Sequence, residues 1–415
     1  MPKRKILVSA YACEPIKGSE PAVGWNWILQ LAKHNELHVI TRCNNQESIE
    51  ANLPNELKHN ITFHYYDTPL LFQRIKKKDK RLYLYNFLWQ IGIVPFARKI
   101  IKQHQIDYTM HLTFGSIWMP TFLPILKTAF IWGPIGGCEC IPKQFLKVMP
   151  LSQKIVQCMR YFLNATVILN PFILLPACRA DVILARTYDT MNAIPRCFHK
   201  KTKVILETAM DNSVFEYKKE KNPTDTVRLI ISARLIAIKN ISMAIKALKY
   251  ISQDRKWHLT IIGSGPEKDR IIRETHNDKL DEKVTIIPFM PRYEALKKIE
   301  ESDIFIFPSL KEGGSWALME AMTIGLPVIC LDWAGMKMIT DDKSAIRLSI
   351  TNPEQMERDM AVAICKLIDN PELRGQMGYA GRERIKAVFN WESKGIFMEN
   401  LFKKLEVTKG NESYQ

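Results

Sequence analysis

Residues 304–331 read IFIFPSLKEGGSWALMEAMTIGLPVICL and carry, in succession, the signals of a strand, a loop, a helix and a second strand. The apolar run at 304–307 predicts a buried strand, and the glycine-containing stretch 308–315 predicts a loop. A helix is expected over 316–324, because Gly325 and Pro327 end it before the apolar run at 328–331. This order is typical of an α/β domain with a parallel sheet.

Two carboxylates flank the junction between the predicted loop and the predicted helix. Glu312 lies in the loop, and Glu320 lies about one turn into the helix. The start of such a helix offers unpaired backbone N–H groups and a positive dipole end to a phosphate. The pattern therefore indicates a sugar-nucleotide site, in which one carboxylate reaches a hexose and the other reaches the ribose. The alternative is a loop acid and an exposed helix acid without a ligand.

The segment with Glu312 and Glu320 resembles the E-x7-E signature of the retaining glycosyltransferases of family 4. Three other stretches resemble segments of the same family: SARLIAIKNISMAIKAL at 232–248, AYACEPIKGSEPAVGWNW at 10–27 and WGPIGGCE at 132–139. The resemblance covers nearly the whole chain. It implies the two-domain B-type glycosyltransferase fold, with donor and acceptor bound in a cleft between the domains.

Strand-like runs alternate with helical patterns along both halves of the chain, which predicts two α/β domains. These runs lie at 6–10, 37–41, 61–66, 108–112, 128–132, 182–185 and 204–206, and then at 228–232, 258–262, 284–287, 304–307 and 328–331. We expect two Rossmann-like, doubly wound domains that face a central cleft. Residues 1–210 would form the acceptor-side domain and residues 227–390 the nucleotide-sugar-binding domain. The resemblance implies that a last helix at 391–408 packs back on the first domain.

Composition limits the partners of the chain. Its 415 residues are 47% hydrophobic, and its formal net charge of +16 suggests an anionic partner. A phosphorylated substrate or an acidic membrane face would be such an anionic partner. A nucleic acid is not expected, because no zinc-finger spacing, RNP pattern or helix-turn-helix signature is present.

Nine cysteines without a C-x2-C spacing read as reduced thiols of a cytoplasmic protein. The close pair Cys138 and Cys140 has no second pair beside it, so a metal site is not expected there. No run approaches the ~20 apolar residues of a spanning helix. The nearest run, 161–178, is interrupted by two asparagines and two prolines and reads as a packed helix and turn.

Arg234 and Lys239 follow the first strand of the second predicted domain. Two fixed cations at that strand end can converge on a diphosphate whose charge grows as the glycosidic bond breaks. In the resembled family such cations replace a metal, so no metal and no cofactor are expected beyond the nucleotide sugar. The alternative is a pair of solvated surface cations.

Further donor-binding candidates follow other strand ends. Gly263 and Gly265 open a strand-to-helix turn that serves either chain geometry or nucleotide contact. Phe289 lies where the family places the nucleotide base. The remaining candidates surround the helix start and are Gly313, Gly314, Ser315 and Trp316. Many family members have E-G-F-G where this chain has E-G-G-S, and a G-G-[PT]-like element is replaced by Ala-Gly-Met at 334–336, so the donor sugar is left open.

In the first predicted domain, Gly18 resembles the family's glycine loop, which approaches the donor phosphate and the acceptor. His111 closes a strand and matches the family histidine that contacts the donor sugar, although a lone histidine is often structural. Gly136, Gly137 and Glu139 are acceptor-side candidates, with a rigid turn as the alternative.

Residues 74–98 mix a basic run with aromatic and aliphatic residues. This composition fits an anionic membrane surface, where family members meet lipid-linked acceptors. The alternative is a solvated loop followed by a core helix.

Together these features predict a retaining hexosyltransferase that uses a nucleotide diphosphate sugar and a glycan or lipid-linked glycan acceptor in surface polysaccharide assembly. Glu312, His111, Arg234 and Lys239 would be catalytic. We expect a cytoplasmic protein with peripheral membrane attachment. Two alternatives remain: a sugar-nucleotide epimerase or hydrolase on the same fold, and a non-catalytic sugar-nucleotide-binding protein.

Overall fold

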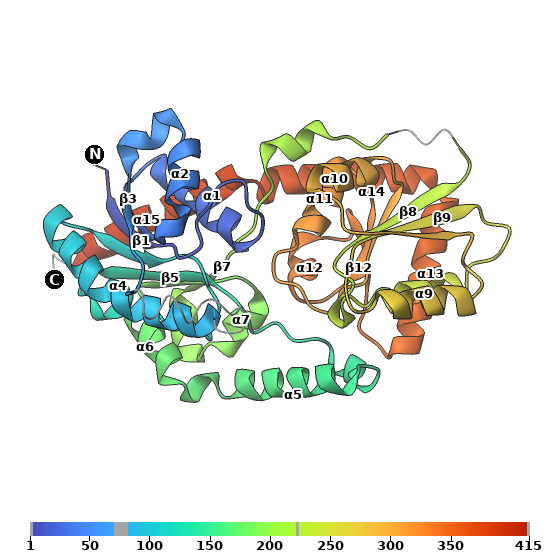
Figure 1. Ribbon diagram of the computed structural model, residues 1–415, viewed down its shortest axis with the longest axis horizontal. Coiled ribbons are helices and arrows are strands. Elements are labelled where there is room, and N and C mark those ends of the chain that lie inside the picture. Colours follow the sequence, from blue (N-terminus) through green and yellow to red (C-terminus); the bar gives the residue numbers. More distant parts are fainter. Residues whose placement is uncertain (1–2, 70–81, 221–223, 413–415) are drawn as a thin grey trace. The chain divides into compact units, whose positions relative to one another are not determined.

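The computed structural model describes residues 3–69, 82–220 and 224–412, and the chain folds into two compact units (Figure 1). The described parts of Met1–Cys138, Leu163–Glu207 and Trp391–Gln415 form the first unit. Glu139–Phe162 and Thr208–Asn390 form the second. Residues 139–162, which the sequence analysis includes in the first domain, thus belong to the second unit. One contact that ties them there is the hydrogen bond from Trp333 Nε1 to Cys140 O, at 2.7 Å.

The first unit is built on a seven-stranded parallel sheet in the order β3-β2-β1-β4-β5-β6-β7. The order reverses between β1 and β4, where Ile6 pairs with Tyr108. The strands are β1 Lys5–Ser9, β2 Glu36–Thr41, β3 Ile61–Tyr65, β4 Tyr108–His111, β5 Ala129–Ile135, β6 Val182–Ala185 and β7 Thr202–Val204. Each predicted strand of this half therefore has a counterpart, although the last one begins two residues early.

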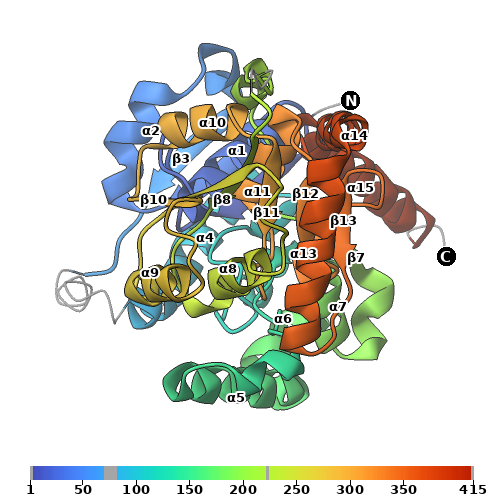
Figure 2. The same ribbon diagram turned by 90° about the vertical axis from the view of Figure 1, so that its right-hand side faces the viewer.

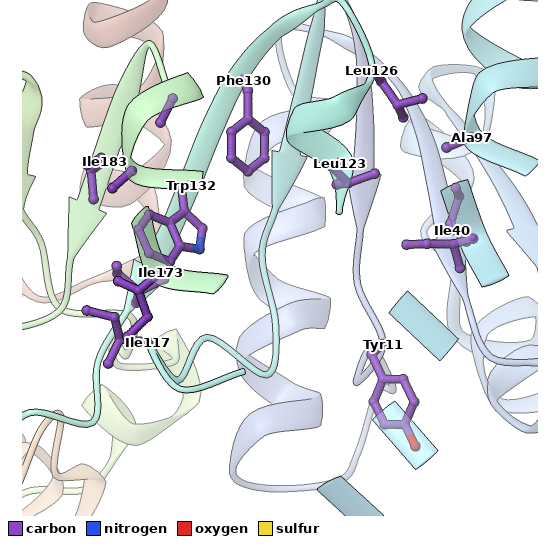
Figure 3. Packing of buried hydrophobic residues seen from close by; sticks show 14 of the residues in the cluster. Tyr11, Ile40, Ala97, Ile117, Leu123, Leu126, Phe130, Trp132, Ile173 and Ile183 are labelled. Atoms are coloured by element: carbon purple, nitrogen blue, oxygen red, sulfur yellow. The ribbon is translucent and has the colours of Figure 1, made fainter. Parts of the chain in front are cut away.

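Helices cover both faces of this sheet (Figures 1 and 2). One face packs on α4 and α6, and the core between them contains Phe130 and Trp132 of β5 against Ile183 of β6 and Ile173 of α6 (Figure 3). On the other face α1 packs against α15, which Arg4 holds through a 2.7 Å ion pair with Glu399. The helices are α1 Glu20–Ala32, α2 Gln46–Asn52, α4 Leu82–His104, α6 Pro171–Arg179, α7 Tyr188–Ala193 and α15 Trp391–Glu412.

The second unit has a six-stranded parallel sheet in the order β10-β9-β8-β11-β12-β13. Its strands are β8 Val227–Ser232, β9 Trp257–Ile262, β10 Val284–Ile287, β11 Ile304–Phe307, β12 Val328–Leu331 and β13 Ala345–Leu348. The order reverses between β8 and β11, which pair through Leu229 and Ile304. Strand β13 was not predicted, because this four-residue edge strand contains an arginine and only its two end residues are buried.

In the second unit α10, α11 and α14 lie on one face of the sheet, and α8, α9 and α13 lie on the other (Figures 1 and 2). These helices are α8 Ile241–Leu248, α9 Lys268–Asn277, α10 Arg292–Glu300, α11 Trp316–Ile324, α12 Ala334–Ile339, α13 Pro353–Asp369 and α14 Pro371–Val388. Helix α11 has the predicted bounds. Ser315 caps its start through Leu318 N, and Gly325 ends it with a positive φ of 101°, a conformation that glycine adopts without strain.

The apolar stretch 161–178 forms the end of one helix and most of another. Helix α5 spans Leu151–Ala165, and α6 starts after Asn170, whose side chain accepts from Phe172 N at 2.9 Å. None of the helices in the described ranges is both long enough and apolar enough to cross a bilayer.

Candidate functional site

The site of the second unit lies at the carboxyl ends of β8 and β11, where the strand order reverses. Open α/β sheets bind their ligands at such a position. The loop after β8 contains Arg234 and Lys239, and the loop after β11 contains Glu312. A backbone hydrogen bond from Leu310 N to Ile238 O, at 2.9 Å, holds the two loops side by side.

Lys239 and Glu312 form an ion pair across these loops. Lys239 Nζ donates to Glu312 Oε1, and the same oxygen accepts from Ser309 Oγ at 2.6 Å. Only 15% of the lysine side chain and 14% of the glutamate side chain are exposed. The lysine also lies 5.5 Å from the ring centre of Phe307. The structure thus brings the predicted cation and the predicted sugar-binding carboxylate together.

Arg234 is exposed on the same loop as Lys239. Among the residues that the structure describes, its guanidinium has no ion-pair or hydrogen-bond partner. Its five donors are therefore available to an anion that reaches the carboxyl end of β8.

Glu320 is nearly buried in α11, although an exposed helix acid was the alternative in the sequence analysis. Its Oε1 accepts from Arg292 Nε at 2.6 Å, and Arg292 also lies 3.5 Å from Asp211 and stacks over Trp316. Burial by itself would lower the pKa of Arg292. The neighbouring carboxylates of Glu320 and Asp211 have the larger combined effect, so the pKa of Arg292 is raised. Arg292 is not among the predicted site residues, although Pro291 before it is a usual signal of a helix start.

Gly263 and Gly265 serve the packing of two loops. A Cβ atom on Gly263 would lie 1.9 Å from Ala233 O, and one on Gly265 would lie 2.3 Å from Leu235 O. Ser264 between them bonds to the neighbouring loop, because its Oγ accepts from Phe289 N at 3.0 Å. The chain-geometry alternative thus has direct support, while nucleotide contact stays a prediction. The Phe289 side chain is 79% exposed.

The glycines after Glu312 allow other close approaches. A Cβ atom on Gly314 would lie 2.0 Å from Thr208 Oγ1, and Gly335 is so close to Gly313 O that a Cβ atom would lie 1.6 Å from it. Trp316 Nε1, at the start of α11, is buried and makes no hydrogen bond to any described residue. The start of α11 therefore combines tight backbone packing with one buried donor.

Lys311, Glu139 and Arg160 extend this charged region within the second unit. Burial and the neighbouring Arg160 lower the pKa of Lys311 to about 8, while Glu139 and Glu312 act in the opposite direction. Glu139 is 3% exposed. Glu139 opens the segment 139–162 of the second unit, whereas Gly136 and Gly137 belong to the first unit, and the acceptor-side role of all three stays a prediction.

In the first unit, His111 lies at the carboxyl end of β4 and is 1% exposed. Burial lowers the pKa of His111 to about 4, and the backbone of Phe114 opposes this only in part. Neither ring nitrogen makes a well-formed side-chain hydrogen bond with a described residue. The imidazole is therefore neutral near pH 7.

A cavity of about 280 Å³ in the first unit adjoins the loop after β4. Its polar lining comes from Glu20, Ser116 and Arg186. Its other lining residues are Leu82, Tyr83, Phe114, Gly115 and Met119. Glu20 fixes one wall, because its Oε1 accepts from Phe114 N at 2.7 Å. Gly136 lies beside Arg186, since a Cβ atom on this glycine would approach the guanidinium to 2.6 Å.

Two other candidate glycines of the first unit differ in their surroundings. Gly137 has a φ of 105° and lies near Ser116, so its conformation favours glycine. A Cβ atom on Gly18 would meet nothing within 4 Å, so packing gives no reason for a glycine at this position. Its predicted contact with the donor or acceptor stays a prediction.

Two further predictions concern the membrane and metals. The basic run of the segment 74–98 lies outside the described residues, which resume at Leu82 with α4, so the structure does not describe Lys76, Lys77 and Lys78. Within the described ranges, no group of three or more His, Cys, Asp or Glu side chains is arranged to hold a metal ion.

Residues 214–384 match the family model described as Glycosyl transferases group 1. The matched residues all lie within the second unit. A putative colanic acid biosynthesis glycosyltransferase of Escherichia coli K12, WcaL, is 29% identical over 191 residues, which cover 44% of this chain and 46% of that protein. The matches to the first curated relatives cover 59%, 46% and 41% of their lengths, or about half.

Solved structures match over both units. Sucrose-phosphate synthase from Thermosynechococcus elongatus has a TM-score of 0.66 and 16% identity, and the match covers 98% of this chain and 100% of that one. Alr3699/HepE of Anabaena, solved in complex with UDP, has a TM-score of 0.60 and 12% identity over 97% of this chain and 100% of that one. Likeness at such identities concerns the fold, and it confirms the predicted B-type glycosyltransferase fold.

Proposed function

We propose that the chain is a retaining glycosyltransferase that transfers a hexose-type sugar from a nucleotide diphosphate donor to a glycan or lipid-linked glycan. The observation that carries the proposal is the meeting of Lys239 and Glu312 at the strand-order reversal of the second unit. There a cation that can bind the diphosphate lies next to a carboxylate that can bind the sugar. The donor needs such neighbours, because its sugar is bonded directly to its diphosphate.

The donor would lie along the carboxyl ends of β8 and β11. Arg234 and Lys239 would bind the diphosphate, and the start of α11 would add its backbone N–H groups. Glu320 would accept hydrogen bonds from the ribose hydroxyls through Oε2, since Arg292 occupies Oε1. Glu312 would contact the transferred sugar.

The reaction would break the bond between the anomeric carbon and the diphosphate oxygen. The two cations would stabilise the charge that grows on the leaving group, which is a role suited to fixed donors. The acceptor hydroxyl would form the new bond on the face that the diphosphate leaves and would transfer its proton to a departing phosphate oxygen. This route needs no protein base and no metal.

The acceptor would bind in the first unit, where the cavity beside Glu20 and Arg186 combines charged and apolar walls. Sugars suit such a cavity, because hydroxyl groups pair with charged side chains and ring faces pack on apolar ones. The neutral imidazole of His111 at the end of β4 would contact the donor sugar as a hydrogen-bonding group without charge.

The names of similar proteins support the substrate class. Alr3699/HepE was solved with UDP, and WcaL is assigned to colanic acid biosynthesis. We infer a nucleotide sugar as donor and a role in bacterial surface polysaccharide assembly. A thermal-shift panel of UDP-, GDP- and ADP-sugars should identify the donor, and product detection with lipid-linked acceptors should then yield an extended glycan. Sugar release or epimerisation without an acceptor would refute the transfer assignment.

We further propose that the basic segment before α4 contacts the inner membrane surface and thereby meets lipid-linked acceptors. Charge reversal at Lys76, Lys77 and Lys78 should then weaken sedimentation with anionic vesicles and leave nucleotide binding intact. The effect should fade as salt rises, because screening acts within ~8 Å at physiological ionic strength. Equal sedimentation of the variant and the wild type would refute this role.

A further inference from the structure

Helix α5 has its polar and apolar sides reversed relative to an ordinary surface helix. Its one buried side chain is a glutamine, Gln157, while six large apolar side chains of the helix are exposed. These six are Leu151, Ile155, Val156, Met159, Phe162 and Leu163, with exposed fractions from 40% to 72%. A surface helix of a globular protein normally turns its apolar side chains toward the core.

The polar side of α5 is the side that faces the protein. Tyr161 Oη donates to Ile141 O, and Asn164 Nδ2 donates to Cys138 O at 2.7 Å. Together with Gln157 and Arg160, these residues have the spacing i, i+3, i+4 and i+7, so they form one face of the helix. The orientation is therefore fixed by specific hydrogen bonds, and the apolar residues are held outward.

The exposed apolar side chains are concentrated in this part of the chain. Val148 precedes α5, and Ile168 and Leu169 follow it, each between 53% and 75% exposed. So many exposed large apolar side chains in one stretch of the chain indicate a contact with a protein or a membrane.

The charges around α5 favour a membrane. From Cys140 to Ala180 the sequence contains no Asp or Glu, but it contains Lys143, Lys147, Lys154, Arg160 and Arg179. The three lysines are exposed. An apolar face bordered by cations, without acids, is typical of helices that lie in the interface of an anionic bilayer. A second copy of the chain fits less well, because its α5 would bring the same positive charges.

We propose that the apolar face of α5 inserts into the surface of an anionic lipid bilayer. The helix has 15 residues and is about 22 Å long at 1.5 Å per residue, so it lies along the interface and does not cross it. The lysines then contact lipid phosphates, and the hydrogen-bonded polar face stays on the protein. This contact goes beyond sugar transfer and is independent of the donor assignment.

Vesicle sedimentation of the full chain tests the contact. The wild type should sediment at low salt with vesicles of equal parts phosphatidylethanolamine and phosphatidylglycerol. The variant Met159→Glu/Phe162→Glu should bind these vesicles more weakly by roughly tenfold or more, because two buried charges oppose insertion. Its thermal melting should match the wild type, since both side chains are exposed.

A matched control carries the same substitutions elsewhere. Val362→Glu/Tyr379→Glu changes two equally exposed apolar residues of α13 and α14, and vesicle binding should be unchanged. A wild type that stays in the supernatant, or an α5 variant that sediments like the wild type, would overturn the proposal. So would an α5 variant that converts a dimer into a monomer without any vesicle binding. Donor binding, measured in parallel by thermal shift, reports separately on the proposed function.

Discussion

In the second unit, Lys239 Nζ donates a hydrogen bond to Glu312 Oε1, and Ser309 Oγ donates to the same carboxylate oxygen. Both charged side chains are largely buried, so their attraction is screened less than that of a surface pair. A diphosphate bound at this point would give the lysine a second anionic partner. The pair therefore links the charge of the leaving group to the carboxylate that would hold the sugar.

Replacement of both cations, Arg234→Ala/Lys239→Ala, should abolish transfer. It should also weaken nucleoside diphosphate binding about tenfold or more, because each charge-assisted hydrogen bond contributes roughly 1.5 to 3 kcal/mol. Calorimetric titration of the nucleoside diphosphate measures the loss.

The control for this variant removes two lysines from exposed positions in α13 and α14. Lys366→Ala/Lys386→Ala makes a comparable change in net charge, and nucleotide affinity should stay at the wild-type value. If the two double variants bind the nucleotide equally well, Arg234 and Lys239 do not bind the diphosphate.

Transfer should continue in the presence of EDTA. The two cations and the start of α11 would supply the positive charge that a divalent ion supplies in metal-dependent enzymes. Product formation is measured before and after dialysis against the chelator. Activity that disappears with EDTA and returns with manganese would contradict the metal-free route.

Burial of His111 predicts a stability change with pH. Its folded pKa of about 4 lies below the ordinary value of 6.5, so the unfolded chain binds the proton first as pH falls. The contribution of neutral His111 to the stability of the folded chain is fully present above pH 6.5 and is lost progressively as the pH falls toward 4. Between pH 7 and 5 the loss is on the order of 2 kcal/mol, because each pH unit below the unfolded pKa costs about 1.36 kcal/mol.

Denaturant unfolding of the wild type and His111→Gln at pH 7 and 5 measures this contribution. The wild type should lose more stability on acidification than the variant, by about 2 kcal/mol. His64, whose pKa burial also lowers to about 4, remains in both proteins, so the difference isolates His111. The exposed residue His59, changed to glutamine, is the control. Equal acid sensitivity of wild type and His111→Gln would mean that His111 is not held neutral.

Local signals were enough to predict the elements around the site. The apolar run at 304–307, the cap Ser315 and the terminator Gly325 act within a few residues, and both β11 and α11 have the predicted bounds. The strand order itself was not among the predictions, because the favoured hand of each βαβ unit does not decide which strands are neighbours. Glu312 and Lys239 were placed at strand ends, where the sheet brings them together.

Contacts between distant residues could not be predicted in this way. Arg292 pairs with Glu320 across 28 positions and from another helix, and no periodicity links the two. The assignment of 139–162 to the second unit depends on contacts such as Trp333 with Cys140, which are 193 positions apart. In α5 the amphipathic pattern is plain in the sequence, but which side faces the protein is decided by hydrogen bonds to residues before the helix.

The two glutamates should be separable by their mutants, because Glu312 would contact the transferred sugar and Glu320 the ribose that stays with the leaving group. Glu320→Gln should weaken binding of the nucleoside diphosphate and of the intact donor alike, since the same ribose hydrogen bonds are lost from both. Glu312→Gln should leave nucleoside diphosphate affinity near the wild-type value and lower turnover on the order of 10²-fold or more, as loss of one transition-state contact does.

Both variants should stay folded, which makes the comparison clean. Arg292 keeps Asp211 as a partner when Glu320 becomes glutamine, and Lys239 can still donate to the amide oxygen of Gln at position 312. Calorimetric titration of the nucleoside diphosphate into each folded variant, together with donor turnover, separates the two roles. Equal losses of nucleoside diphosphate affinity in both variants would show that the two glutamates do not contact different parts of the donor. Full turnover of the Glu312→Gln enzyme would show that Glu312 does not contact the transferred sugar.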